Sequence, residues 1–286
     1  MNVRDRIQAK RVAVDHELKR LLREDDSPLF EAMRYAVLSG GKRFRPVLLL
    51  CSGEYFGVSL EMLLPFSCGL ELIHNYSLIH DDLPSMDNDD YRRGKPSCHK
   101  AFGEGLALLA GDGLISLAFE VLAGAPVPPA LYPEKQEVIR EISRAAGSRG
   151  MVAGQLLDIT LPPQELTEEK IHELILKKTG SLIVSAVKSG AILGKAAPSE
   201  IQAIEEYGKN VGLAFQVRDD LMDAAQQTAS AFPPRPNYVL VVGRGEAQKR
   251  LQGFVADAVQ ALEKASLRSE ELRELALRLL RLDKGD

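Results

Sequence analysis

Residues 60–87 read LEMLLPFSCGLELIHNYSLIHDDLPSMD, a largely apolar run that leads into a cluster of aspartates. The apolar residues recur at three- and four-residue spacing, which predicts one long helix ending at the first aspartates. Pro84 disfavours helix in the residue before it and can end the helix, so we expect Asp87 to fold back towards Asp81. Carboxylates this close repel each other and raise each other's pKa unless a cation neutralises them.

A second cluster, Asp219-Asp220-Leu221-Met222-Asp223, follows another largely apolar run. Its three carboxylates have i,i+3 and i,i+4 spacing, so they can project from one face of a helix. Two separate clusters suggest a site for divalent metal, and oxygen ligands favour Mg²⁺ over zinc. For either cluster alone, aspartates that cap backbone amides or face water are an equally good interpretation.

Composition excludes several classes of protein. The 286 residues contain no linker, repeat or low-complexity tract, and 45% are apolar, so we expect one domain over residues 1–286. A net charge of -4 and a pI near 5.8 give no basic footprint for nucleic acid. We expect neither a signal peptide nor a membrane span, because the start is charged and the apolar stretch 105–125 contains Asp112 and Glu120. Three widely spaced cysteines fit a reducing, cytoplasmic compartment.

Helical periodicity covers almost the whole chain, with Gly and Pro between segments. The one segment that could be extended is the apolar run 239–242. We therefore predict an all-α helical bundle around a central cavity. The predicted helices lie at about residues 28–39, 60–82, 104–123, 133–160, 167–178, 181–194, 199–224, 244–265 and 269–282.

Cations gather in two short segments. Residues 40–46, GGKRFRP, place three positive side chains in a glycine-introduced turn, and residues 92–96, RRGKP, place three more just after the first aspartates. Such cations usually only keep a surface soluble. Together with metal carboxylates, however, Lys and Arg donors could hold diphosphates, and two cationic segments allow two such substrates.

At this point the sequence resembles the trans-isoprenyl diphosphate synthases, most closely bacterial-type short-chain farnesyl or geranylgeranyl diphosphate synthases. The resemblance covers about residues 28 to 280. The motifs that carry it, in order, are GKRFRP (41–46), ELIH (71–74), the aspartates of 81–87, RRGKP (92–96), GQLLD (154–158), KTG (178–180), and FQ (215–216) leading into the aspartates of 219–223.

The resemblance implies an all-α homodimer in which both aspartate motifs hold Mg²⁺ against an allylic diphosphate. Six residues would ligate the metal: Asp81, Asp87 and Asp219 as main ligands, with Asp82, Asp220 and Asp223 ligating directly or through water. Arg92, Lys178 and Thr179 would help hold the same diphosphate, and Gln216 would lie beside the reacting carbon. The pocket for isopentenyl diphosphate would be formed by Lys42, Arg45, His74 and Arg93.

The implied reaction is ionisation of the allylic C–O bond, attack by the isopentenyl double bond, and loss of a proton to the released diphosphate. Plainer interpretations stay open for single residues. Lys178 and Thr179 could be an ordinary helix C-terminus, and His74 an ordinary buried histidine. Gln155 and Asp158 could form a polar helix face or support the site.

Product length depends on the helix that leads to Asp81. Tyr76 lies five residues upstream, roughly 7.5 Å at 1.5 Å rise per residue, where its ring could close the cavity floor. In the family an aromatic there, followed by a small residue such as Ser77, resembles farnesyl synthases, so we favour a C15 product over C20. Packing of Tyr76 between helices explains the residue equally well.

One departure from the family pattern follows Asp223. The loop at 224–238 is shortened and lacks a diphosphate-binding lysine; either Arg218 or Arg235 could replace it. The family alternatives are a geranylgeranyl diphosphate synthase, or a diphosphate-binding subunit that is weakly active or non-catalytic. A terpene cyclase would share the metal chemistry, but it would not need Lys42, Arg45 and His74.

Overall fold

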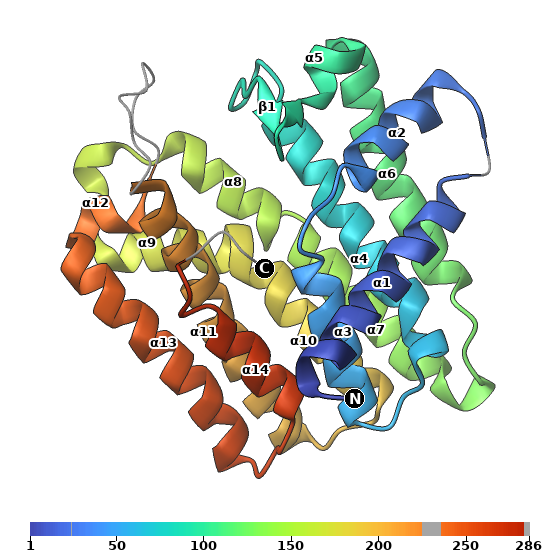
Figure 1. Ribbon diagram of the computed structural model, residues 1–286, viewed down its shortest axis with the longest axis vertical. Coiled ribbons are helices and arrows are strands. Elements are labelled where there is room, and N and C mark those ends of the chain that lie inside the picture. The colour runs from blue at the N-terminus through green and yellow to red at the C-terminus, as the bar shows by residue number, and fades with distance from the viewer. Residues whose placement is uncertain (24, 225–235, 283–286) are drawn as a thin grey trace.

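The computed structural model describes residues 1–23, 25–224 and 236–282, and helices make up most of it (Figure 1). This confirms the predicted all-α fold. The strands in the described part of the chain are β1 (Tyr91–Arg92) and β2 (Lys95–Pro96), a two-residue antiparallel pair that turns the chain after the first aspartates.

The helices have the following bounds in chain order: α1 (Val3–Leu21), α2 (Pro28–Leu38), α3 (Phe44–Tyr55), α4 (Leu60–Asp81), α5 (Cys98–Phe102), α6 (Glu104–Gly124), α7 (Tyr132–Ala146), α8 (Met151–Thr160), α9 (Glu168–Ile175), α10 (Ser181–Leu193), α11 (Pro198–Ala224), α12 (Tyr238–Val242), α13 (Arg244–Lys264) and α14 (Glu270–Arg278). Short 3₁₀ turns lie at η1 (Pro129–Leu131) and η2 (Pro163–Glu165), and a π-helical turn, η3 (Leu176–Gly180), joins α9 to α10.

Helix starts follow local capping chemistry. The side chains of Ser27 and Ser59 accept hydrogen bonds from backbone amides in the first turns of α2 and α4, and Thr167 does the same for α9. Pro28 adds a fixed backbone angle at the first position of α2. These caps satisfy amides that have no partner within the helix.

Helices α3, α4 and α10 form the centre of the bundle. Helix α3 packs against α4 and α10, while α10 also contacts α7 and α11. Helices α3 and α10 cross closely, because a Cβ added at Gly190 would lie 2.4 Å from the backbone nitrogen of Gly53. Figure 1 shows α11, α13 and α14 on one side of this centre and α1, α2 and α6 on the other.

Several predicted elements differ in the structure. The helix predicted at 133–160 is two helices, α7 and α8, separated by a turn at 147–150 that contains two glycines. Residues 239–242 are helical rather than extended, because Asn237 caps the backbone amide of Val239 and starts α12. The last predicted helix ends at Arg278 instead of continuing to 282.

Helix α6 is the one helix in the described ranges that is long and apolar enough to cross a membrane, by length and composition alone. It packs against α4 and α2, yet only 33% of the residues in its most apolar 18-residue window are buried. Leu108 and Leu109 are 47% and 57% exposed on its surface.

Candidate active site

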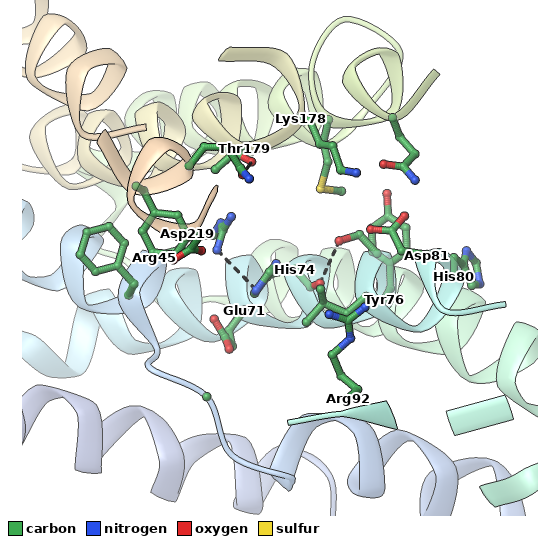
Figure 2. Close-up of a pocket in the computed structure, with 18 of the residues that line it drawn as sticks. Arg45, Glu71, His74, Tyr76, His80, Asp81, Arg92, Lys178, Thr179 and Asp219 are labelled. Atoms are coloured by element: carbon green, nitrogen blue, oxygen red, sulfur yellow. Dashed lines mark hydrogen bonds between the residues drawn. The ribbon is translucent and has the colours of Figure 1, made fainter. Parts of the chain in front are cut away.

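One cavity of about 980 Å³ collects residues from both aspartate clusters and both cationic segments. Figure 2 shows side chains from helices on opposite sides pointing into it. The predicted site residues that line it are Lys42, Arg45, His74, Tyr76, Ser77, Asp81, Asp87, Arg92, Arg93, Lys178, Thr179, Gln216 and Asp219.

The first aspartate cluster folds back as Pro84 predicts. Helix α4 ends at Asp81, and the backbone amide of Asp87 donates to the Asp81 carbonyl at 2.8 Å. Both carboxylates therefore line the same cavity. Figure 2 shows Lys178 reaching towards Asp81 from the opposite wall.

Asp82 does not line the cavity, and its carboxylate binds Arg92 instead. Its carboxylate accepts hydrogen bonds from Arg92 Nε at 3.0 and 3.2 Å and also from Nη2, and its side chain is buried. Arg92 also pairs with Asp89 at 3.2 Å. Asp82 thus orients Arg92, which lines the cavity in its place.

The second cluster divides among three environments. Asp219 lines the cavity, whereas Asp220 is buried against other protein groups and Asp223 is exposed. A rotation of about 100° per residue separates neighbouring side chains on a helix. The spacing predicts that all three carboxylates project from one helix face, but within the described residues Asp219 is the one member of the cluster that lines this cavity.

Two aspartates in the cavity have raised pKa values. Burial raises the pKa of Asp81 to about 7, with Lys178 opposing the rise and Asp87 adding to it. Burial also raises the pKa of Asp219 to about 6, opposed by Arg218 and Lys42. Elevated carboxyl pKa values in a cavity are a mark of sites that bind cations.

These shifts predict how stability depends on pH. Between about pH 4 and 7 the folded ligand-free protein holds protons that the unfolded chain has released, so its stability should fall as pH rises through this window. Thermal unfolding from pH 5 to 8 should show a falling melting temperature. An Asp81→Asn/Asp219→Asn variant should make the profile shallower but not flat, because burial also raises the pKa of Asp220 to about 6; an unchanged slope in that variant would reject the assignment.

The cationic turn at 40–46 places Lys42 and Arg45 at the cavity and uses Arg43 to anchor the turn to the protein. Gly40, Gly41 and Arg43 adopt positive φ of 101°, 130° and 50°, which turns the chain into α3. Arg43 is buried at the wall of the cavity, where it donates to Asp15 and Glu71 at 2.8 Å each. Of the three cations of this turn, the family resemblance assigns Lys42 and Arg45 to the pocket for isopentenyl diphosphate, whereas Arg43 pairs with two protein carboxylates and anchors the turn.

Arg45 and His74 face the cavity together. Arg45 Nη1 lies 3.4 Å from His74 Nε2, and the guanidinium sits 5.7 Å from the Phe215 ring centroid. Burial and the neighbouring arginines lower the pKa of His74 well below its usual value. His74 is therefore neutral, and its Nε2 accepts from Arg45.

The π-helical turn η3 presents Lys178 and Thr179. Its extra residue shifts the helical phase, a device frequent at functional sites, and both side chains line the cavity. Lys178 Nζ donates to Asp158 at 2.5 Å, and Thr179 Oγ1 donates to Gln216 Oε1 at 2.9 Å. Asp158 therefore supports the site by holding Lys178.

The residues present suit Mg²⁺ with a bound diphosphate. Within the described ranges, no three His, Cys, Asp or Glu side chains converge closely enough to enclose an ion alone. Mg²⁺ usually keeps several waters and is held by one or two carboxylates plus phosphate oxygens, which matches the cavity aspartates. Arg45 Nε and both amide atoms of Gln155 are buried without a hydrogen-bond partner in the described part of the chain, as expected of groups that await a ligand.

One cavity residue that lay outside the sequence prediction is Arg11. It lines the cavity from α1 and donates to the Gly41 carbonyl at 3.1 Å, but on a highly charged helix it carried no distinguishing signal. Arg218, which was named from the sequence as a replacement for the loop lysine, does not line this cavity; it lies 3.5 Å from Asp219 and donates to the Arg281 carbonyl. The loop at 225–235, including Arg235, lies outside the described residues.

Comparisons with known proteins agree with this geometry. The family model described as polyprenyl synthetase matches residues 26–231. Farnesyl diphosphate synthase of Escherichia coli is 38% identical over 253 residues, covering 85% of each chain. Geranylgeranyl diphosphate synthase of Cyanophora paradoxa is 42% identical over 219 residues, covering 76% of this chain and 72% of the relative. The crystal structure of an FPP/GFPP synthase from Zymomonas mobilis superimposes with a TM-score of 0.87 at 35% identity, covering 98% and 99% of the two chains.

Proposed function

The chain belongs to the polyprenyl synthetase family, and on that premise we propose that it is a short-chain trans-prenyltransferase. It condenses dimethylallyl or geranyl diphosphate with isopentenyl diphosphate, and its main product is farnesyl diphosphate. The observation that carries the proposal is that one cavity joins two aspartate clusters to two cationic segments. That arrangement provides places for a metal-bound diphosphate and for a second diphosphate beside it.

The allylic diphosphate lies between the two clusters. Asp81, Asp87 and Asp219 would hold Mg²⁺ against it, and the bound metal would supply positive charge that stabilises a departing diphosphate. Arg92 and Lys178 add fixed cations, held by Asp82 and Asp158 in the orientations that the site needs. Leaving-group charge is thereby neutralised as the C–O bond breaks.

The second substrate binds at the opposite end of the cavity. Lys42, Arg45, Arg93 and neutral His74 hold the diphosphate of isopentenyl diphosphate, which places its double bond towards the allylic carbon beside Gln216. The released diphosphate takes the proton that completes condensation. Apolar side chains such as Phe44 and Phe215 keep water from the cation.

Binding of isopentenyl diphosphate separates this function from a terpene cyclase. Calorimetry should detect binding to the wild type, and Arg45→Met should weaken it by about tenfold or more, because a buried charge-assisted contact is lost. Arg140→Met is the matched control, since that arginine pairs with Glu137 on the surface. A wild type that binds allylic diphosphates but not isopentenyl diphosphate would favour a cyclase.

Tyr76 sets the product length in this proposal. Its side chain is buried, lines the cavity, and packs edge-on against His80 at a centroid distance of 5.7 Å. Tyr76→Ala should convert a mainly C15 product into mainly C20 or longer, while Tyr76→Phe should keep C15. Chromatography of dephosphorylated products measures this, and an unchanged distribution in Tyr76→Ala would exclude Tyr76 as the floor. A wild type that already makes C20 would identify a geranylgeranyl diphosphate synthase.

We also propose a single-domain, cytoplasmic enzyme that acts as a homodimer through α6. The exposed Leu108 and Leu109 leave an apolar strip on a helix that is otherwise suited to burial, and a second copy would cover it. Light scattering should give twice the 31.4 kDa chain mass for the wild type. Leu109→Asp should shift the mass towards the monomer, and a monomeric wild type would reject the proposal.

A further inference from the structure

We propose that Asp220 is a positioning residue, which fixes the hydrogen-bond polarity of Gln216 and Thr179 so that both present oxygen lone pairs to the reacting carbon. This inference rests on the proposed function and assigns Asp220 a different role from its neighbour Asp219. It revises the expectation that Asp220 ligates the metal.

A continuous chain of hydrogen bonds carries the inference. The backbone amide of Tyr238 donates to Asp220 Oδ2 at 2.6 Å, and Gln216 Nε2 donates to Asp220 Oδ1 at 2.9 Å. Thr179 Oγ1 then donates to Gln216 Oε1 at 2.9 Å. Three elements that are distant in sequence, α12, α11 and η3, are joined through one carboxylate.

The carboxylate sets the direction of every bond in this chain. An ionised Asp accepts only, so the amide group of Gln216 must turn its NH₂ to Asp220 and its oxygen to Thr179. The Thr179 hydroxyl then donates its one hydrogen to that oxygen. The remaining lone pairs of both residues are left for the cavity, which they line. Oxygen lone pairs stabilise a developing carbocation, whereas N–H or O–H groups there would oppose it.

Asp220 is enclosed in a way that Asp219 is not. It is 5% exposed, does not line the cavity, and has a protein donor on each oxygen. The donor on Oδ2 is itself fixed, because Tyr238 is fully buried and its hydroxyl lies 2.9 Å from both Glu168 and His172. The carboxylate is therefore committed to orienting protein groups.

The test replaces Asp220 by Asn, the closest isostere. The side-chain NH₂ of the new Asn would then face the NH₂ of Gln216, one of the two groups that donate to Asp220. The Gln216 amide should therefore flip, and the Thr179 hydroxyl should turn its hydrogen to the cavity. We expect kcat to fall by about ten- to a hundredfold, with the KM values and half-saturating Mg²⁺ within about twofold of wild type. In a Thr179→Val background the same change should cost about threefold or less, because the two residues act through one chain.

A binding readout separates positioning from metal ligation. Mg²⁺ with inorganic diphosphate should raise the melting temperature of Asp220→Asn as much as that of wild type, while the adjacent Asp219→Asn should lose most of this rise. Loss of the rise in Asp220→Asn, or an unchanged kcat, would overturn the inference. This readout does not need turnover: a wild type that shows the rise but makes no elongated product would refute the proposed function and leave the ligand assignment testable.

Should Asp220→Asn not fold, a crystal structure of the wild type with Mg²⁺ and inorganic diphosphate decides the question. We expect Asp220 to keep its bonds to Gln216 and Tyr238. An Asp220 oxygen at about 2.1 Å from a metal ion would be inner-sphere ligation and would overturn the inference.

Discussion

Asp81→Asn should lower kcat by about a thousandfold or more while it makes the ligand-free protein more stable. The loss follows because an amide cannot supply the charge that holds Mg²⁺ against the departing diphosphate, a contribution of several kcal/mol. The gain follows because burial raises the pKa of Asp81 to about 7, so its ionised form is unfavourable in the folded state. At pH 8, removal of that charge should stabilise the ligand-free protein by on the order of a few kcal/mol.

The measurement pairs steady-state elongation with thermal unfolding. Asp90→Asn is the matched control, because Asp90 is exposed, lies in the loop that follows Asp81 and pairs with Lys100 at 2.8 Å. It should leave both quantities nearly unchanged. An Asp81→Asn variant that keeps normal kcat, or that is less stable at pH 8 than wild type, would contradict the account.

Arg43→Ala should destabilise the protein by about 3–5 kcal/mol, the second large effect, because it leaves a buried charge without its partner. Arg43 and Glu71 have side chains only 2% exposed and lie 2.8 Å apart. Urea unfolding measures the change. Arg140→Ala, which breaks an exposed pair with Glu137, should cost less than about 1 kcal/mol.

A double variant identifies the cause of the loss. Glu71→Gln added to Arg43→Ala should recover part of the lost stability, because it removes the unpaired charge. A double variant that is less stable by the full sum of the two single losses would show that the buried pair does not act as a unit.

The sequence predicted those features that depend on local chemistry. The helix at 60–82 and the return of Asp87 to Asp81 follow from periodicity and from one proline, and both are confirmed. The residues that meet in the cavity were identified because the family motifs occur in order. In the structure, most of these residues line the cavity.

Features that depend on long-range contacts were not predictable. Arg43 looks like a substrate cation until Glu71, 28 residues away, is placed beside it. Asp220 looks equivalent to Asp219 until Tyr238 folds back onto it. The π-helical turn at η3 leaves no clear periodicity signal in the sequence. Its contact with α8 is also long-range: a Cβ at Gly154 would lie 2.1 Å from the Lys178 backbone nitrogen, so the two elements approach closely.

The central claim is that this cavity elongates an allylic diphosphate. The most direct test incubates the purified wild-type protein with labelled isopentenyl diphosphate and geranyl diphosphate, with and without Mg²⁺, and resolves the products by chain length after phosphatase treatment. We predict a C15 alcohol that forms only when Mg²⁺ is present. Folded protein that yields no elongated product from either dimethylallyl or geranyl diphosphate would contradict the claim.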